Sequence, residues 1–214
     1  MVRHRARIRF RKEGDLRLTG HHDLMRLWER LFRRAGIKLR MSEGFHKRPK
    51  LNLPSALALG VAGIDEVLEV EFEANDEANP PLAAELLTTC QRHAPPGLGI
   101  DSLVLLDPAL PLAELSRVTY ELAVPPQRRE SVAARVSELL ALKSYLLDRG
   151  PERKPLDVRP LIDDATWSGD ALQVRVWVPR EGSVRPRDLI AIFGLDPDET
   201  TEAALTRTSV ELRA

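Results

Sequence analysis

The chain has 214 residues, 43% of them hydrophobic and 30% charged, and its formal net charge is zero. These values are typical of a globular protein with a buried core. No apolar run approaches the roughly 20 residues that span a bilayer, and no apolar stretch typical of a secretory signal follows the first residues. The lone Cys90 excludes an internal disulfide framework, so we expect a cytoplasmic protein without a membrane segment.

The zero net charge conceals an uneven distribution. Residues 1–50 contain 16 Lys and Arg against 5 Asp and Glu, together with four of the five histidines. Residues 51–214 contain 16 against 27. This asymmetry indicates that the N-terminal segment faces a polyanion or an acidic partner surface. The alternative is that the basic segment packs against acidic strands of its own chain.

The first elements have clear periodicity. In residues 3–11 arginines alternate with apolar side chains, which predicts a half-buried strand. Helical spacing predicts a helix from about His21 to Gly36, with Asp23 as N-cap or first-turn acid and Gly36 as C-cap. Residues 63–65 are expected to form a turn before an acidic strand over 67–73. The expected cross-strand partners are Arg5, Arg7 and Arg9 on one strand and the outward Glu69, Glu71 and Glu73 on the other.

The remaining elements complete a repeated pattern. A helix is expected over 80–93 and a strand over 100–106, and the second half repeats strands and helices in the same order. The later expected segments are strands at 118–124, 172–178 and 207–212, helices at 128–142 and 185–193, and extended segments at 144–149 and 155–163. The order predicts an α+β protein of two tandem ferredoxin-like (βαββαβ) lobes with antiparallel sheets. The N-terminal lobe, 1–107, carries a basic loop, and the C-terminal lobe covers 116–214.

The strongest functional signal is the loop Ser42-Glu43-Gly44-Phe45-His46-Lys47-Arg48-Pro49-Lys50. It combines backbone N–H groups, an aromatic ring and cations, which suits phosphate or nucleotide capture. A solvated loop is the plain alternative, with Phe45 as a core plug instead of a stacking platform. The 182–186 loop leads into a short helix whose N-terminus suits an anion. The candidate nucleic-acid-binding residues are Arg17, Arg33, Arg34, Phe45, His46, Lys47, Arg48, Lys50 and Arg185.

Three N-terminal segments, 14–23, 33–36 and 42–50, give the chain a family resemblance. Four C-terminal segments add to it, namely 157–162, 182–186, 193–195 and 207–208. The chain resembles the radical-SAM-linked proteins, bacterial domain of unknown function 2344, which are encoded beside or fused to a radical SAM enzyme. The resemblance implies such an enzyme as partner. The chain departs from the family at Gly20-His21-His22-Asp23, where the usual sequence is Ser-His-Leu-Asp.

The inventory of reactive residues argues against catalysis by this chain. Radical SAM chemistry needs an iron–sulfur cluster held by cysteine thiolates, which one cysteine cannot hold, and Cys90 is expected in the core. We expect no cofactor and no metal, because adjacent histidines on a helix point in different directions and no HExxH spacing is present. Asp163-Asp164 is expected to be a solvated turn.

The function expected is therefore a non-catalytic accessory of the radical SAM enzyme that binds RNA or an RNA-containing assembly through its basic N-terminal face. Two alternatives remain open. One is a protein-only adaptor that docks on the partner. The other is a metal-independent endoribonuclease that uses His21 or His22 with Arg48.

Overall fold

The fold is described from a computed structural model and covers residues 2–74, 82–151, 153–195 and 204–213. The chain divides into two compact units, one of Met1–Leu57 with Gly63–Glu114 and one of Ala58–Ala62 with Leu115–Ala214. Both units mix helices with antiparallel strands, so the predicted α+β class is confirmed in its broad form. No helix within the described ranges is long and apolar enough to cross a membrane.

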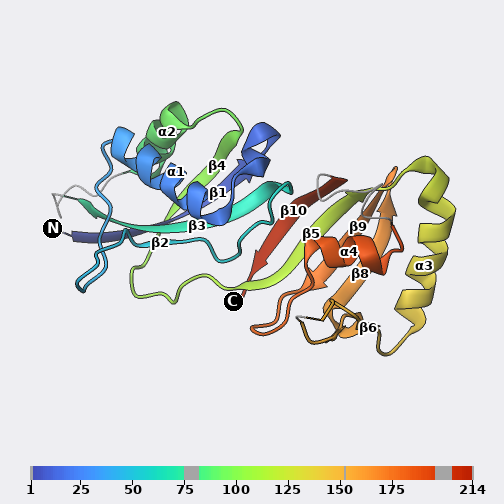
Figure 1. The fold of residues 1–214 in the computed structure, drawn as a ribbon. Coiled ribbons are helices and arrows are strands. Elements are labelled where there is room, and N and C mark those ends of the chain that lie inside the picture. The colour runs from blue at the N-terminus through green and yellow to red at the C-terminus, as the bar shows by residue number, and fades with distance from the viewer. Residues whose placement is uncertain (1, 75–81, 152, 196–203, 214) are drawn as a thin grey trace. The chain divides into compact units, whose positions relative to one another are not determined.

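The first unit is a sheet covered by helices (Figure 1). Its elements are β1 Val2–Lys12, η1 Gly14–Leu18, α1 His21–Arg34, β2 Leu51–Asn52, β3 Ala62–Ala74, α2 Ala83–His93 and β4 Leu98–Leu106. Strand β1 lies between β4 and β3, and β2 pairs with β3; every pairing is antiparallel. The core forms where Ile8 and Phe10 of β1 meet Trp28 and Phe32 of α1. Alternation along β1 and helical spacing along α1 bring these side chains to one interface.

The second unit has the same kinds of element. They are β5 Leu115–Ala123, η2 Pro126–Arg128, α3 Arg129–Ala141, β6 Leu146–Leu147, β7 Leu156–Asp157, η3 Arg159–Leu161, β8 Ile162–Ser168, β9 Ala171–Trp177, α4 Pro186–Ile192 and β10 Leu205–Leu212. The strand order is β10-β5-β9-β8, all antiparallel, with β6 and β7 as a separate pair. Buried Leu122, Val174 and Leu189 are part of its core.

The predicted turn at 63–65 is wrong. Strand β3 begins at Ala62, and Gly63 pairs with Lys12 of β1. The side chain of Glu66 occupies the space beside this glycine, so that a Cβ atom at Gly63 would lie 2.4 Å from Oε1 of Glu66 unless that side chain moved. For α1 the N-cap is Gly20, Asp23 lies in the first turn, and Gly36 has the positive φ of +72° expected just after a helix.

The expected arginine–glutamate ladder is confirmed for two of its three arginines: Arg5 stands opposite Glu71 and Arg7 opposite Glu69. Arg9 is the exception, because it stands opposite Val67. Arg7 pairs with Glu69 at 2.8 Å, and Arg9 pairs with Asp65 at 3.0 Å. These pairings confirm, for part of the basic segment, the alternative that its arginines pack against an acidic strand of the same chain.

The expectation that Arg5 and Glu69 point outward to solvent is also wrong. Arg5 is 2% exposed and Glu69 is 1% exposed. The segment after β4 covers them: Arg5 donates hydrogen bonds to the carbonyls of Leu110 and Pro111, and Glu69 accepts one from the backbone N–H of Ala113 at 3.0 Å. Arg5 and Glu69 also pair with each other. Arg5 and Glu69 thus form a buried ion pair, and their hydrogen bonds fix the 110–113 segment to the sheet.

Candidate nucleic-acid interface

Residues 41–50, named here the basic hairpin, project from the edge of the first unit's sheet. Leu39 bridges to Phe72 of β3, and Leu51 pairs with Val70, only two positions away on the same strand. The residues between Leu39 and Leu51 are therefore looped out of the sheet. Met41 and Pro49 form a bridge of their own at the base. The sequence predicted an irregular loop here, and the structure shows a hairpin with a defined base.

Glu71 fastens both feet of the basic hairpin. Its backbone carbonyl accepts the Arg40 N–H at 2.9 Å, and its N–H donates to the Lys50 carbonyl at 3.0 Å. Its carboxylate lies 3.5 Å from Nη1 of Arg40 and 3.6 Å from Nζ of Lys50. Because Glu71 is only 8% exposed, these contacts anchor the hairpin to the interior of the sheet. Lys50 therefore holds the foot of the hairpin, whatever else it contacts.

The tip of the hairpin is closed by Ser42 and Arg48. The Ser42 N–H donates to the Arg48 carbonyl at 2.7 Å, and the Ser42 hydroxyl accepts the Arg48 N–H at 3.0 Å. Gly44 has a φ of +117°, a backbone conformation that favours glycine. Two reciprocal hydrogen bonds and one glycine thus shape a loop that presents its side chains outward.

The side chains at the tip are turned to solvent. Phe45 is 98% exposed, so the alternative of a core plug is wrong. Its ring meets that of His46 edge to face at 5.2 Å between centroids. Lys47 and Arg48 are exposed, and neither has an acidic partner within the described ranges. An exposed ring beside free cations is an arrangement for stacking on bases and contacting phosphates.

A groove of about 430 Å³ runs beside the base of the hairpin. Met41 and Pro49 border it on the hairpin side, and Arg33 near the end of α1 borders it on the other. The full lining is Glu29, Arg33, Gly36, Ile37, Lys38, Leu39, Met41 and Pro49. The predicted residue Arg33 is therefore brought next to the hairpin, with an apolar surface between them.

Other predicted site residues are placed elsewhere. Arg34 donates to the His93 carbonyl at 2.9 Å, so its guanidinium ties α1 to the end of α2. Arg17 lies in η1. Arg185 is the N-cap of α4 in the second unit, where Asp188 accepts the Arg185 N–H at 2.9 Å. The carboxylate of Asp188 also pairs with Arg149 at 3.0 Å. Asp188 thus occupies the N-terminus of α4, where the sequence predicted that an external anion could bind.

The two histidines of the nuclease alternative lie at the start of α1. His22 is exposed, whereas His21 lines a cavity of about 10 Å³ with the buried Lys12 and Glu66. That volume holds about one water molecule. Lys12 donates to the Thr19 carbonyl at 2.7 Å. In the part of the chain that the structure describes, no three His, Cys, Asp or Glu side chains gather as a metal site.

The predicted core position of Cys90 is confirmed, since its exposure is 0%. Burial raises the pKa of the Cys90 thiol to about 12. A buried thiol with a raised pKa is protonated at neutral pH and is a poor nucleophile and metal ligand.

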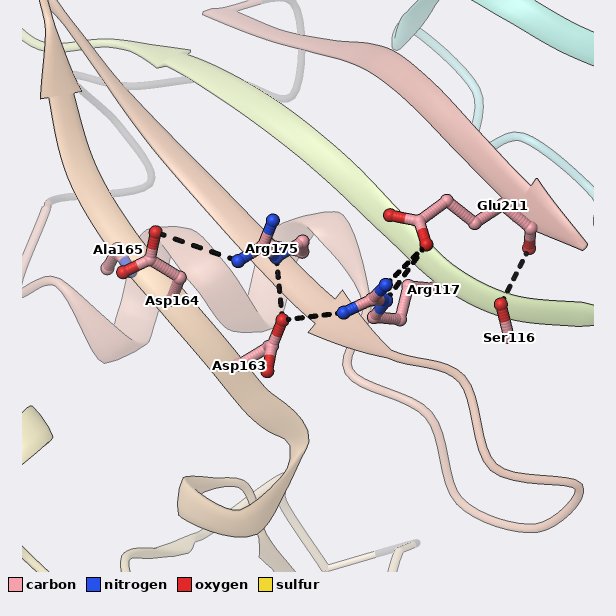
Figure 2. Close-up of polar contacts among 7 residues, drawn as sticks. All are labelled: Ser116, Arg117, Asp163, Asp164, Ala165, Arg175 and Glu211. Atoms are coloured by element: carbon pink, nitrogen blue, oxygen red, sulfur yellow. Dashed lines mark hydrogen bonds and ion pairs between the residues drawn. The ribbon is translucent and has the colours of Figure 1, made fainter.

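A charge network that sequence reasoning missed lies on the sheet of the second unit (Figure 2). Arg117 of β5 reaches Glu211 of β10 at 2.7 Å and Asp163 of β8 at 3.2 Å. Arg175 of β9 donates to the same Asp163 at 2.6 Å and lies 4.0 Å from Asp164. The predicted solvated turn at Asp163-Asp164 is therefore wrong, because both residues lie in β8. Each of β5 and β9 contains a single arginine, Arg117 and Arg175, and no local pattern pairs them with Asp163.

The network shifts the acid–base equilibria of its members. Hydrogen bonding to Glu211 raises the pKa of Arg117 further above its usual range, although burial opposes this. Burial alone raises the pKa of Asp163, but hydrogen bonds and the charges of Arg175 and Arg117 outweigh it and hold that pKa below its usual value. The Arg117 guanidinium also lies 4.7 Å from the centroid of the Trp177 ring. These contacts tie strands together and point to a structural role.

Comparisons with known proteins add a family but no activity. The family model described as an uncharacterized protein conserved in bacteria (DUF2344) matches residues 5–186. No curated protein matches the chain significantly. Among solved structures, the small subunit of acetolactate synthase from Thermotoga maritima is similar at 13% identity, covering 100% of this chain and 99% of that one. Its TM-score of 0.27 is too low to carry an argument about fold or function.

Proposed function

The chain belongs to the bacterial protein family DUF2344, and on that premise we propose that it is a non-catalytic accessory protein that binds RNA through the basic hairpin. The proposal includes presentation of the RNA, or of an RNA-containing assembly, to a radical SAM enzyme, the partner that the sequence resemblance implies. The chain's single cysteine, buried and protonated, supports assigning the cluster chemistry to the partner.

The observation that carries the proposal is the exposure of Phe45. Burying a phenylalanine ring stabilises by about 1.5–3 kcal/mol, so an exposed ring can contribute that free energy to binding a partner. Here the ring is 98% exposed at the tip of a closed loop, with Lys47 and Arg48 beside it. Nucleobases offer that ring a flat apolar face, and the adjoining phosphates offer the cations their charge.

We further propose that each unit is a ferredoxin-like lobe. Supporting this, the first unit has the strand order β4-β1-β3-β2, and the second has β10-β5-β9-β8. When the separate β6–β7 pair is left out, the first strand of each unit lies between the fourth and the third strands, which is the order of a split βαβ fold. A ferredoxin-like sheet leaves its loops and edges available for recognition, and the hairpin projects from such an edge.

The test is RNA binding by the purified protein in EDTA, measured by fluorescence anisotropy over a range of salt concentrations. The variant Lys47→Glu/Arg48→Glu removes two phosphate contacts, so its log–log salt slope should fall by about two units. Lys50 is left unchanged, because an acid there would face Glu71 and loosen the hairpin. The matched control is Lys143→Glu/Arg187→Glu, an exposed Lys and Arg of the second unit, which should bind as the parent does.

Each contrary outcome has a definite meaning. No binding at about 50 mM salt, where phosphate contacts are strongest, would overturn the RNA proposal and leave the protein-only adaptor. Discrete cleavage products in EDTA that His21→Ala or His22→Ala abolishes would overturn the non-catalytic assignment in favour of the endoribonuclease. Binding by the charge-reversed variant equal to that of the parent would remove the basic hairpin from the site.

A further inference from the structure

The groove beside the basic hairpin has a chemistry of its own. Its apolar lining comes from Ile37, Leu39, Met41 and Pro49, and Met41 is 40% exposed. Its volume of about 430 Å³ lies within the range of small-molecule sites, roughly 300–1,000 Å³. A group of the size of a nucleobase fits this volume, and its flat face can contact the apolar lining.

The charged groups at the groove are of both signs. Arg33 is exposed and has no acidic partner among the described residues, whereas Lys38 pairs with Glu73 at 3.0 Å. Glu29 lies one helical turn before Arg33 and likewise has no ion-pair partner within the described ranges. A carboxylate repels phosphate but accepts hydrogen bonds from N–H groups. The groove is thus suited to a ligand with an anion near Arg33 and a donor edge near Glu29.

We infer that this groove holds one unpaired nucleotide of the RNA, so that the basic hairpin recognises single-stranded RNA and not duplex. The inference rests on the proposed function. In a duplex the faces of the bases are stacked and their Watson–Crick edges are paired, so neither Phe45 nor the groove has anything to contact. In a single strand one base stacks on Phe45 and another enters the groove, while Arg33, Lys47 and Arg48 meet the phosphates.

Glu29 makes guanine the base that the groove accepts best. The Watson–Crick edge of guanine carries two adjacent donors, which match the two oxygens of a carboxylate. Adenine and cytosine present one amino group, and uracil places a carbonyl on each side of its single N–H. The expected order of affinity is therefore guanine first, then adenine and cytosine, and uracil last.

The experiment compares short labelled RNAs by fluorescence anisotropy with the full-length protein. A uridine homopolymer with one central guanosine should bind about tenfold more tightly than the homopolymer itself. A mixed-sequence RNA should bind at least about tenfold more tightly as a single strand than annealed to its complement. Glu29→Gln replaces one acceptor oxygen with a donor and should abolish the guanosine preference. The matched control, Glu85→Gln on α2, should keep it.

The outcomes separate this inference from the proposed function. Equal binding of single strand and duplex, with the Lys47→Glu/Arg48→Glu variant still defective, would leave RNA binding in place and overturn the inference. A guanosine preference that survives in Glu29→Gln would overturn the role of Glu29. If no RNA of either form binds, both fail together. Met41→Ala, which widens the groove without touching the tip, should weaken binding of the guanosine-containing strand severalfold and that of the homopolymer less.

Discussion

The buried carboxylate of Glu69 accepts a hydrogen bond at 3.0 Å from the backbone N–H of Ala113, a residue of the segment that follows β4. The same carboxylate pairs with Arg5, and Arg5 in turn donates to the carbonyls of Leu110 and Pro111. One ion pair thus satisfies several backbone groups of a segment without helix or strand. Without the ion pair, these backbone groups would need hydrogen bonds from water molecules.

We predict that Glu69→Gln destabilises the protein by about 3 kcal/mol, because it leaves the guanidinium of Arg5 buried without its anion. The free energy of unfolding from urea titration at neutral pH measures this. Glu13→Gln, which removes an exposed partner of Arg11, should stay within about 0.5 kcal/mol of the parent. A loss of the same small size at Glu69 would show that Arg5 finds another partner when the carboxylate is removed.

Glu69 should also make stability depend on pH. Burial raises the pKa of Glu69, but hydrogen bonds from Ala113, Arg5 and Arg7 outweigh it, so that the pKa in the folded state lies below the ordinary value of 4.5. Between these two values the unfolded chain binds more protons than the folded one. The stability that Glu69 contributes is therefore present above pH 4.5 and is lost as the pH falls through the folded pKa. The difference in stability between the parent and Glu69→Gln should shrink over that window, and a constant difference would contradict the assignment.

Phe45→Ala should separate binding from folding. Because the ring is 98% exposed, we expect the free energy of unfolding to change by less than about 0.5 kcal/mol. The loss of one stacked base should weaken binding of single-stranded RNA by about 1–3 kcal/mol, measured by anisotropy. Leu18→Ala removes another exposed apolar side chain, on η1, and should alter neither quantity. A clear loss of stability in Phe45→Ala would mean that the ring packs against the protein after all.

Ser42→Ala should loosen the tip of the basic hairpin. The variant removes the hydroxyl that accepts the Arg48 N–H, while the reciprocal bond from the Ser42 N–H remains. We expect faster amide hydrogen exchange at Arg48 and a severalfold weaker affinity for RNA, because a loop that must order on binding loses affinity. Ser42→Thr keeps the hydroxyl and should restore both. Unchanged exchange at Arg48 in Ser42→Ala would assign the closure of the loop to the backbone bond alone.

The strands could be predicted from the sequence, but the segments that lie over the faces of the sheets could not. Alternation identified β1 and β3, since a strand with one buried face leaves a period of two. Alternation cannot say whether the other face is open, and so Arg5 was expected in solvent although the 110–113 segment lies over it. Gly63 was read as a turn because glycine often marks one. Its small size in fact makes room for the carboxylate of Glu66, a contact that no local pattern reveals.

The exposure of the loop could be predicted from the sequence, but its anchoring could not. The composition of 42–50 predicts a solvent-facing loop, and Phe45, Lys47 and Arg48 are exposed there, whereas RNA binding by these residues remains a proposal. The anchoring by Glu71 joins residues more than twenty positions apart, so it depends on the register of β3. That register decides that Lys50 holds the hairpin in place. The same limit explains the error at Asp163, which was expected in a turn but pairs with Arg117 and Arg175 of two other strands.

Arg117 should matter more for the second unit than its partial exposure suggests. It links β5 to β8 through Asp163 and to β10 through Glu211, whereas Arg129 pairs with the exposed Asp170. We expect Arg117→Met to lower the urea midpoint clearly more than Arg129→Met does, with tryptophan fluorescence as the readout, to which Trp177 beside Arg117 contributes.

A double-mutant cycle then tests whether the contacts of Arg117 act as a network. Asp163 is shared with Arg175, so removing Asp163 from a chain that already lacks Arg117 still breaks one pair. The losses in Arg117→Met and Asp163→Asn should therefore overlap only in part, and their sum should exceed the loss in the double variant. Because these charges lie near the surface, high salt should reduce the overlap. Fully additive losses at low salt would show that Arg117 stabilises the sheet through Glu211 or by packing on Trp177, and not through Asp163.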